Sequence, residues 1–399
     1  MGIRLVVVDD NPHEAWEGRT HPANATFGQF LPAILEVPGS GGSPAVARID
    51  HCVPVRAAAS APATLPLDAR IRVVATAPFD GIAGYLRHAS TLLRRNAAIL
   101  RPVIRAADLV WIKVPASNGP LAAALARTAG VPRFGYVAGS ATGVAGNQER
   151  GRIGGAAARI VGAGYDLAGR LASLGGDRVV VGTDLDGEGI VTSLVEPGEL
   201  RPGPGSAPWP RDPGRLRLAW AGRLARGKGL EALLDAVARL AAAPPEGRRV
   251  ELVVLGDGPA RASLGSRAER LGIADRVSWR GFVADRAPYL DTLAGADLFV
   301  FPSAAEGFPK VILDAFAVGL PVAAAPSGAL GGLGGERFEP IPADPDAIAR
   351  SVARLASDPE RARRLQVAGS RFVAAHTRPA EAARLVARWR HRYPELPWG

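Results

Sequence analysis

The chain has 399 residues, which at a usual size of about 150 residues per domain suggests two or three domains. Its hydrophobic residues (47%) and charged residues (22%) occur in the proportions of a globular protein, which excludes a disordered or fibrous chain. The single cysteine, Cys52, excludes an internal disulfide and a cluster of zinc-binding thiolates, and it fits a reducing compartment.

The formal net charge of +10 raises the question of a nucleic-acid partner. Lysine occurs only at Lys113, Lys228 and Lys310, so the basicity comes almost entirely from arginine. The arginines are spread along many expected helices, and no basic run is interleaved with the aromatic side chains that a base-stacking surface needs. We therefore expect no nucleic-acid partner.

The first expected element is a strand at residues 3–8, which is too short for the apolar core of a signal peptide. No run approaches the roughly 20 apolar residues needed to span a bilayer, so we expect a cytoplasmic protein. The pattern up to residue 200 predicts a Rossmann-like domain with a helical segment at 119–128. Its other expected strands are residues 71–75, 109–114, 134–137 and 179–181.

A stretch dense in proline and glycine at 201–213 predicts a linker, after which strands and helices alternate clearly through the segment 214–377. This alternation predicts a parallel sheet with helices on both faces, that is, a second Rossmann-like domain. The amphipathic helix within 378–399 is expected to pack back on the first domain. The expected strands are 216–221, 250–255, 277–279, 298–301 and 322–325, and the helices are 230–242, 260–271, 288–294, 310–318 and 380–393.

Two loops at the carboxyl ends of expected strands contain residues suited to binding a diphosphate. The glycine-rich loop 222–229 contains Arg223 and Lys228, two cations beside a backbone that a ligand can approach closely. The alternative for this loop is a glycine-rich turn with solvated basic residues. In the loop 303–310, Pro309 is placed where a helix begins, and free backbone amides there can bind an anion. Glu306 and Asp314 flank this position and can accept hydrogen bonds from hydroxyls.

As a set, these motifs resemble the C-terminal domain of the family-4 retaining glycosyltransferases, which have the GT-B fold. The resemblance covers roughly residues 216–327, and the N-terminal half matches only in architecture. It implies an α/β chain with two doubly wound domains facing a central cleft. The motifs, in chain order, are Gly222-Arg223 with Lys228-Gly229, Gly256-Asp257-Gly258-Pro259, Pro302-Ser303, Glu306-Gly307-Phe308-Pro309 and Gly319-Leu320-Pro321-Val322.

The resemblance implies roles for individual residues. Arg223 and Lys228 would hold the donor diphosphate and stabilise the charge of the leaving group, and Glu306 would orient the transferred sugar. Asp314 would take the ribose hydroxyls. Front-face attack, in which a donor phosphate oxygen takes the proton of the acceptor, needs no metal, no other cofactor and no dedicated base. The expected donor-site residues are Gly28, Gly222, Gly256, Phe282, Val283, Gly307, Phe308, Pro309, Lys310, Val311 and Asp314.

The sequence departs from the family pattern at four positions. Asp314 stands where glutamate is usual, Gly28 replaces a pair of glycines, and residues 138–140 lack the usual histidine. A glycine-rich stretch at 331–335 replaces an acidic residue. These changes suggest an unusual sugar or acceptor, or a non-catalytic binder of nucleotide sugars. A sugar-nucleotide epimerase is a further alternative, because the phosphate clamp would suffice for it.

On the acceptor side, Asp10, His13 and His21 are candidates for binding acceptor hydroxyls. The alternative is that Asp9 or Asp10 caps a turn and that the histidines face solvent. We expect a small-molecule acceptor, such as a secondary metabolite. The rival is polysaccharide or glycolipid assembly at a membrane surface, since the segment 81–107 has five arginines and no acidic residue.

Overall fold

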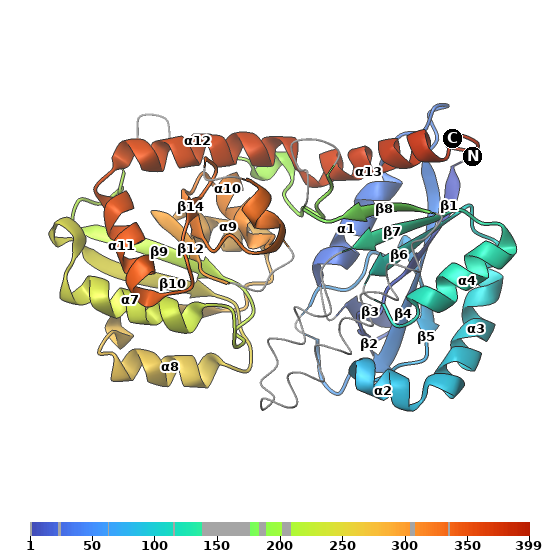
Figure 1. Ribbon diagram of the computed structural model, residues 1–399, viewed down its shortest axis with the longest axis horizontal. Coiled ribbons are helices and arrows are strands. Elements are labelled where there is room, and N and C mark those ends of the chain that lie inside the picture. Colours follow the sequence, from blue (N-terminus) through green and yellow to red (C-terminus); the bar gives the residue numbers. More distant parts are fainter. Residues whose placement is uncertain are drawn as a thin grey trace. The chain divides into compact units, whose positions relative to one another are not determined.

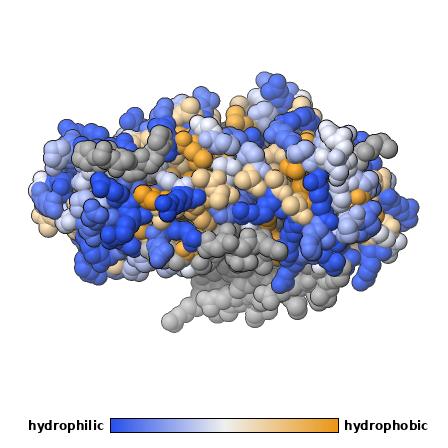
Figure 2. All heavy atoms as spheres, turned by 90° about the horizontal axis from the view of Figure 1, so that it is seen from above, coloured by the Kyte–Doolittle hydropathy of each residue, from blue (hydrophilic) through white to orange (hydrophobic). Residues whose placement is uncertain are grey.

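The computed structural model describes residues 2–22, 25–62, 64–114, 116–137, 176–182, 189–201, 209–303, 308–333 and 336–399. The chain forms two compact units, coloured by sequence in Figure 1. The first comprises Met1–Leu194 and Arg378–Gly399, and the second comprises Val195–Thr377. Within the described residues, no helix has the length and apolar character needed to cross a membrane. Hydrophilic residues cover most of the face shown in Figure 2.

The first unit contains an eight-stranded sheet with β1 at its centre, between β4 and β6. Every described strand pair is parallel except the hairpin of β2 and β3. Strands β1 and β6 are almost entirely buried, as expected where helices cover both faces of a parallel sheet. The strands are β1 (Ile3–Val8), β2 (His13–Trp16), β3 (Arg19–Pro22), β4 (Val46–Ala57), β5 (Ile71–Thr76), β6 (Leu109–Val114), β7 (Arg133–Val137) and β8 (Asp177–Val180).

The helices of the first unit cover both faces of its sheet. Alternate residues of β6 divide between these faces: Val110 and Ile112 join the apolar cluster with α3 and α4, and Trp111 points to the other side. On that side Trp111 contacts Phe27 of α1 and Trp389 of α13, with ring centroids 5.2 and 5.6 Å away. The helices are α1 (Ala25–Leu35), α2 (Gly81–Arg87), α3 (Ala89–Arg105), α4 (Gly119–Ala129) and α13 (Arg378–Arg392).

The second unit contains a six-stranded sheet with the order β11-β10-β9-β12-β13-β14, and its strand pairs are all parallel. The central pair is β9 and β12, with Leu218 beside Leu298. Both residues are fully buried. The strands are β9 (Arg215–Ala221), β10 (Arg249–Leu255), β11 (Val277–Gly281), β12 (Leu298–Phe301), β13 (Val322–Ala324) and β14 (Glu339–Pro340). The helices are α7 (Leu230–Ala242), α8 (Arg261–Arg270), α9 (Arg286–Ala294), α10 (Val311–Ala317), α11 (Pro345–Ala356) and α12 (Pro359–Ala375).

The strand order of the second unit determines where a ligand can bind. From β9 the chain adds β10 and β11 on one side, and then crosses to β12, β13 and β14 on the other side. The strand order therefore reverses between β9 and β12. In open α/β sheets, ligands bind at the carboxyl ends of the strands beside such a switch point. The loops that leave β9 and β12 are the two loops that the sequence singles out.

The predicted fold class is confirmed, since both units have a predominantly parallel sheet between helices. Two expectations for the first unit are corrected. The twelve-residue strand β4 was not expected, and neither was the hairpin of β2 and β3, which pairs with β4 where a loop was expected. The short strand β14 extends the second sheet beyond the predicted set.

Candidate functional site

The site in the second unit is built from loops whose backbones pack directly on one another. A Cβ atom on Gly229, at the end of the loop after β9, would lie 2.3 Å from the carbonyl oxygen of Pro302. A Cβ atom on Gly256, at the end of β10, would lie 1.9 Å from the carbonyl oxygen of Gly222. Both glycines also have positive φ angles, 74° and 124°. Glycine is therefore required at both positions to bring the three loops together.

Hydrogen bonds hold the loop after β9 against the loop after β10. The Gly222 amide donates to the Leu255 carbonyl at 3.0 Å, and the Leu224 amide donates to the Asp257 carbonyl at 2.9 Å. The Leu224 side chain is completely buried beneath the loop. The backbone is thus held on both sides of Arg223, and Lys228 directly precedes Gly229, which packs against Pro302.

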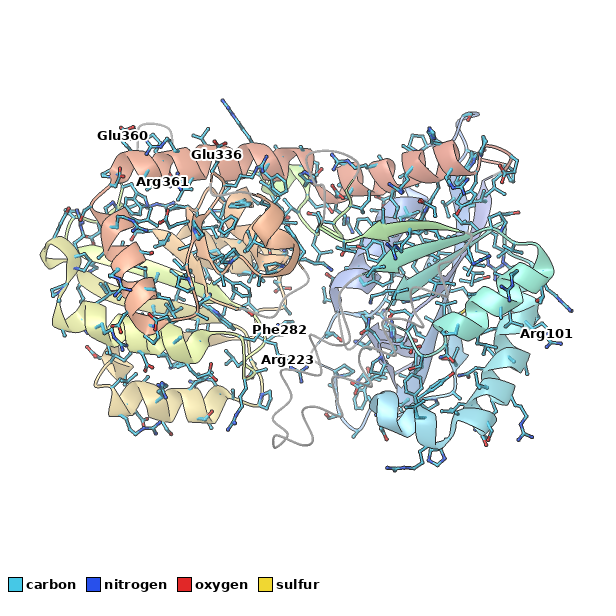
Figure 3. The ribbon with its side chains drawn as sticks, in the orientation of Figure 1. Arg101, Arg223, Phe282, Glu336, Glu360 and Arg361 are labelled. Carbon is cyan, nitrogen blue, oxygen red and sulfur yellow. The ribbon has the colours of Figure 1, made fainter. Side chains whose placement is uncertain are left out.

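The two predicted cations differ in exposure. Arg223 is exposed and Lys228 is half-buried. Figure 3 labels Arg223 and Phe282 on the loops that follow β9 and β11, with strand β10 between these two strands in the sheet. Phe282 follows β11 directly and is 52% exposed, which leaves its aromatic ring accessible to a ligand. Val283, the next residue, is half-buried.

The loop after β12 is only partly described. Glu306 and Gly307, two of the expected site residues, lie outside the described residues, as do residues 138–140. Phe308 and Pro309 are buried, and the Pro309 carbonyl accepts a hydrogen bond from the Ile312 amide at 3.1 Å. Helix α10 begins at Val311 with Lys310 as its N-cap, one residue later than expected.

Asp314, the expected ribose ligand, lies in α10 and is largely buried. Arg286 donates to its Oδ1 at 2.7 Å, and the hydroxyl of Tyr289 donates to its Oδ2 at 3.2 Å. Arg286 also makes a bidentate contact with Glu199, at 2.8 and 3.0 Å. Burial raises the pKa of Asp314, against the attraction of the Arg286 guanidinium. The sequence reasoning missed Arg286, Tyr289 and Glu199, because no motif marks them.

In the first unit, the acidic residues after β1 have partners within the same unit. Asp10 accepts hydrogen bonds from the amide of Ser117 and, at 3.2 Å, from the side chain of Asn118, directly before α4. Asp9 accepts from the amide of Asn11 at 3.1 Å, and Lys113 lies 2.9 Å from its other oxygen. These contacts agree with the turn-capping alternative. Burial raises the pKa of Asp10 to about 6.

The two histidines of the hairpin each have a backbone partner, and they differ in exposure. His13 is buried, and its Nδ1 lies 2.9 Å from the carbonyl oxygen of Asn11. His21 is half-buried, and its Nδ1 lies 2.7 Å from the carbonyl oxygen of Thr64. The ring of His13 meets the ring of His51 edge to face, with centroids 5.2 Å apart. Burial lowers the pKa of His51 to about 3.

Lys113 and Gly28 of the first unit both pack against side chains within that unit. Lys113, which sequence reasoning noted only as one of three lysines, is buried between Asp9 and the ring of Phe27, 4.2 Å from the ring centroid. Gly28 lies inside α1, where a Cβ atom would be 2.9 Å from Leu67 Cδ1. The missing side chain at Gly28 thus makes room for packing within the unit. Among the described residues, no group of three His, Cys, Asp or Glu side chains could hold a metal ion.

Comparisons with known proteins agree with the geometry of the second unit. Residues 215–358 match the sequence model of the family "Glycosyl transferases group 1". A GDP-mannose-dependent alpha-(1-6)-phosphatidylinositol dimannoside mannosyltransferase of Mycobacterium tuberculosis is 34% identical over 160 residues, 38% of each chain. A 2-deoxystreptamine glucosyltransferase of Streptomyces kanamyceticus is 34% identical over 146 residues, 36% of each chain. The matches thus span less than two fifths of these relatives' lengths.

Solved structures resemble the chain over nearly its full length. Sucrose-phosphate synthase from Thermosynechococcus elongatus has a TM-score of 0.67 at 17% identity, covering 98% of this chain and 100% of its own. The Anabaena protein Alr3699/HepE, solved in complex with UDP, has a TM-score of 0.62 at 16% identity, covering 97% and 99%. At such identities the likeness shows the fold alone. Residues 215–358 therefore match the group 1 glycosyltransferases in sequence, and the chain as a whole has the GT-B fold.

Proposed function

We propose that the chain is a retaining glycosyltransferase that moves a sugar from a nucleoside diphosphate to a hydroxyl of a small-molecule acceptor. One observation carries the proposal: the loop with Arg223 and Lys228 lies at the switch point of the second sheet, with Gly229 against Pro302. Pro302 begins the loop that contains Glu306. The candidate diphosphate clamp and the candidate sugar ligand therefore come from the two strands between which ligands of this fold bind.

The chemistry needs charge stabilisation at the leaving group. When the bond between the sugar and the diphosphate breaks, negative charge grows on the departing phosphate oxygens. An arginine fork and a lysine ammonium on a fixed backbone can stabilise this charge without reorganising. In the proposed front-face reaction, a phosphate oxygen of the donor takes the proton of the acceptor hydroxyl while that hydroxyl attacks the same face of the sugar. We assign no metal to this step, since the two cations supply the charge.

The relatives' names support the reaction class and leave the acceptor open. One relative is named for 2-deoxystreptamine and another for phosphatidylinositol dimannoside. For this chain we propose a small-molecule acceptor, bound with the help of the first unit, where Asp10, His13 and His21 are the candidate residues. The bonds of Asp10 to Ser117 and Asn118 mean that an acceptor hydroxyl would have to share its carboxylate.

A membrane-surface acceptor is the second candidate, and helices α2 and α3 favour it. Leu86 and Leu93 are 59% and 41% exposed on these helices. Figure 3 shows Arg101 pointing outward from α3. Exposed apolar side chains beside cations are typical of helices that lie on anionic lipid. Five exposed arginines accompany the leucines, namely Arg87, Arg94, Arg95, Arg101 and Arg105.

The proposed function is tested first by measuring nucleotide binding and then by identifying the reaction product. A thermal-shift panel of uridine, guanosine, adenosine and thymidine diphosphates should raise the unfolding midpoint with at least one of them. The corresponding nucleotide sugars are then incubated with hydroxyl-bearing acceptors, and the products are identified by mass spectrometry. The proton coupling at the anomeric carbon of the product should show the same anomeric configuration as that of the donor. Inversion at C2 of the sugar with no transfer would identify an epimerase instead, and binding with no reaction would indicate a non-catalytic binder.

A further inference from the structure

A partly buried charged cluster surrounds Asp314, and nothing in the donor-site motifs accounts for it. Its members come from three places: Glu199 from the first residues of the second unit, Arg286 and Tyr289 from α9, and Asp314 from α10. Arg286 lies between the two carboxylates and bonds to both, while Tyr289 bonds to Asp314 alone. The contacts occupy one position on each oxygen of Asp314.

A carboxylate oxygen has two lone pairs, so each oxygen of Asp314 retains one position for a further donor. The two remaining positions can accept hydrogen bonds from two neighbouring hydroxyls. Although burial alone would lower the pKa of Arg286, the facing carboxylates raise it, so the guanidinium stays charged. Burial raises the pKa of the Tyr289 hydroxyl, so its proton remains available to donate to Asp314.

The position of Arg286 in the chain adds a second argument. It is the first residue of α9 and follows the loop 282–285, which begins with the exposed Phe282. One side chain therefore connects this loop to the carboxylate of Asp314. The family resemblance implies that the backbone around Phe282 and Val283 meets the base of the donor and that Asp314 meets its ribose. A nucleoside holds its base and ribose at a fixed separation, and the Arg286 side chain would hold these two contact groups at a fixed separation as well.

We infer that Arg286 and Tyr289 are positioning residues that orient the Asp314 carboxylate toward the vicinal hydroxyls of the donor ribose. The inference rests on the proposed function, since it assumes a nucleoside diphosphate donor. Aspartate is one methylene shorter than the glutamate usual in the family, and Arg286 and Tyr289 fix the plane of its carboxylate by bonding to one oxygen each. Neither positioning residue contacts the reacting atoms.

A purely structural role for the cluster would be to attach the segment 195–201 to the second unit. That segment has an independent attachment, since the Arg201 amide donates to the Ala317 carbonyl at 2.8 Å and the Arg201 side chain pairs with Asp291. Removing the Arg286 guanidinium therefore leaves the segment attached. Arg201→Gln is a matched control: it weakens the same attachment and removes one positive charge, without a contact to Asp314.

The test compares a ribonucleoside diphosphate with its 2′-deoxy counterpart, using the base that the thermal-shift panel selects. Isothermal titration gives the ratio of the two Kd values for each variant. We expect the wild type to prefer the ribonucleotide by about tenfold, the effect of about one hydrogen bond to a charged group. Arg286→Gln should lower the ratio at least threefold, Tyr289→Phe should lower it less, and Arg286→Lys should restore part of it. The 2′-deoxynucleotide should bind all variants about equally.

Arg201→Gln should keep the wild-type ratio, and Asp314→Asn should lower it as Arg286→Gln does. An unchanged ratio in Arg286→Gln, or tighter ribonucleotide binding because Asp314 is released, overturns the positioning role while the proposed function stands. A wild type that binds none of the nucleoside diphosphates refutes the proposed function itself. Circular dichroism of each variant verifies that the fold is intact before the ratio is interpreted.

Discussion

Gly229 lies against the carbonyl of Pro302 so closely that a Cβ atom there would be only 2.3 Å from the oxygen. The contact joins the end of the loop after β9 to the beginning of the loop after β12. Gly229 also has a φ of 74°, which costs an L-amino acid about 1–2 kcal/mol without any clash. The contact and the backbone angle can be separated by mutation.

Gly229→Ala should destabilise the fold by more than the backbone cost and weaken nucleotide binding, because the loop must move away from Pro302. Gly247 is the matched control, since its φ is 75° and a Cβ atom there would meet nothing within 4 Å. Gly247→Ala should cost about 1–2 kcal/mol and leave nucleotide affinity unchanged. Urea unfolding and titration calorimetry measure the two effects. Equal costs for the two variants would show that the contact with Pro302 is unimportant.

Arg223→Ala and Lys228→Ala should each weaken diphosphate binding about tenfold and slow transfer, since each removes a charge-assisted contact. The loss of affinity in Arg223→Ala should become smaller as salt is added, because Arg223 is exposed and salt screens its attraction to the diphosphate. Arg270→Ala is the control, as Arg270 is an exposed arginine that ends α8 at the opposite edge of the sheet. Titration and initial rates at two salt concentrations provide the readout. Wild-type affinity and rate in both loop variants would count against the clamp.

Glu306→Ala should lower kcat by at least a hundredfold while the affinity for the nucleoside diphosphate changes little. The expected role of Glu306 is to orient the transferred sugar, which the diphosphate lacks. Glu336→Ala, which removes an exposed acidic side chain elsewhere in the second unit, should leave both quantities unchanged. Steady-state kinetics and titration with the diphosphate alone separate the two effects. If Glu306→Ala turns over normally, the assignment of the sugar ligand is wrong.

Because His51 is buried, we expect the folded state to lose stability on acidification. The unfolded chain takes up a proton on this ring below about pH 6.5, whereas the folded chain keeps it neutral down to about pH 3. Between these values acid therefore favours the unfolded state, by about 1.4 kcal/mol per pH unit for one proton. His51→Phe should reduce this slope, as measured by urea unfolding at pH 7, 5.5 and 4.5.

Asp10 contributes with the opposite sign. Its folded-state pKa is raised to about 6 from 3.8, so between these values the folded chain binds the extra proton and acid stabilises it. Asp10→Asn removes this compensation, and the loss of stability between pH 6 and 4 should become steeper than in the wild type. Parallel slopes for the wild type and both variants would mean that neither group titrates as its burial implies.

The preference for a small-molecule acceptor predicts no sedimentation of the protein with vesicles of anionic phospholipid. If the protein does sediment, the double substitution Leu86→Ser and Leu93→Ser should abolish the binding. Leu65 is an exposed leucine elsewhere in the first unit, and Leu65→Ser should leave the binding unchanged. That pattern would favour the membrane-surface acceptor over the small molecule. Binding that both the double variant and Leu65→Ser retain would place the contact away from these leucines.

The strands, helices and site loops of the second unit could be predicted from the sequence because each is marked by a local pattern of residues. Buried apolar strands alternate with amphipathic helices, and each site loop has glycines at positions where the backbone requires them. The strand β4 was missed because it contains polar side chains that its neighbours compensate. Asp50 within it is fully buried, and Arg4 and Arg48 pair with it at 2.6 and 2.9 Å. Arg72 lies 3.6 Å from the same carboxylate, and no local pattern shows that an aspartate in such a run will pair with three arginines.

The cluster around Asp314 was unreadable for a related reason. Arg286 is 28 residues from Asp314 and 87 residues from Glu199 in sequence, and the contacts form only when α9 packs against α10 and against the segment that contains Glu199. Family motifs predicted Asp314 as a ligand, since that role depends on its spacing from Glu306. The partners of Asp314 depend on tertiary packing, which a single sequence does not encode in any short pattern.

The first unit is assembled from two stretches of chain, and the second from one. Trp389 of α13 is fully buried against Trp111 and Phe134, so the core of the first unit stays open until residues Arg378–Gly399 are available. On the ribosome, the second unit can therefore fold before the first, although it is synthesised later. Expressed as a separate fragment, Val195–Thr377 should remain monomeric and well folded, whereas a fragment ending at Leu194 should aggregate through its uncovered aromatic surface.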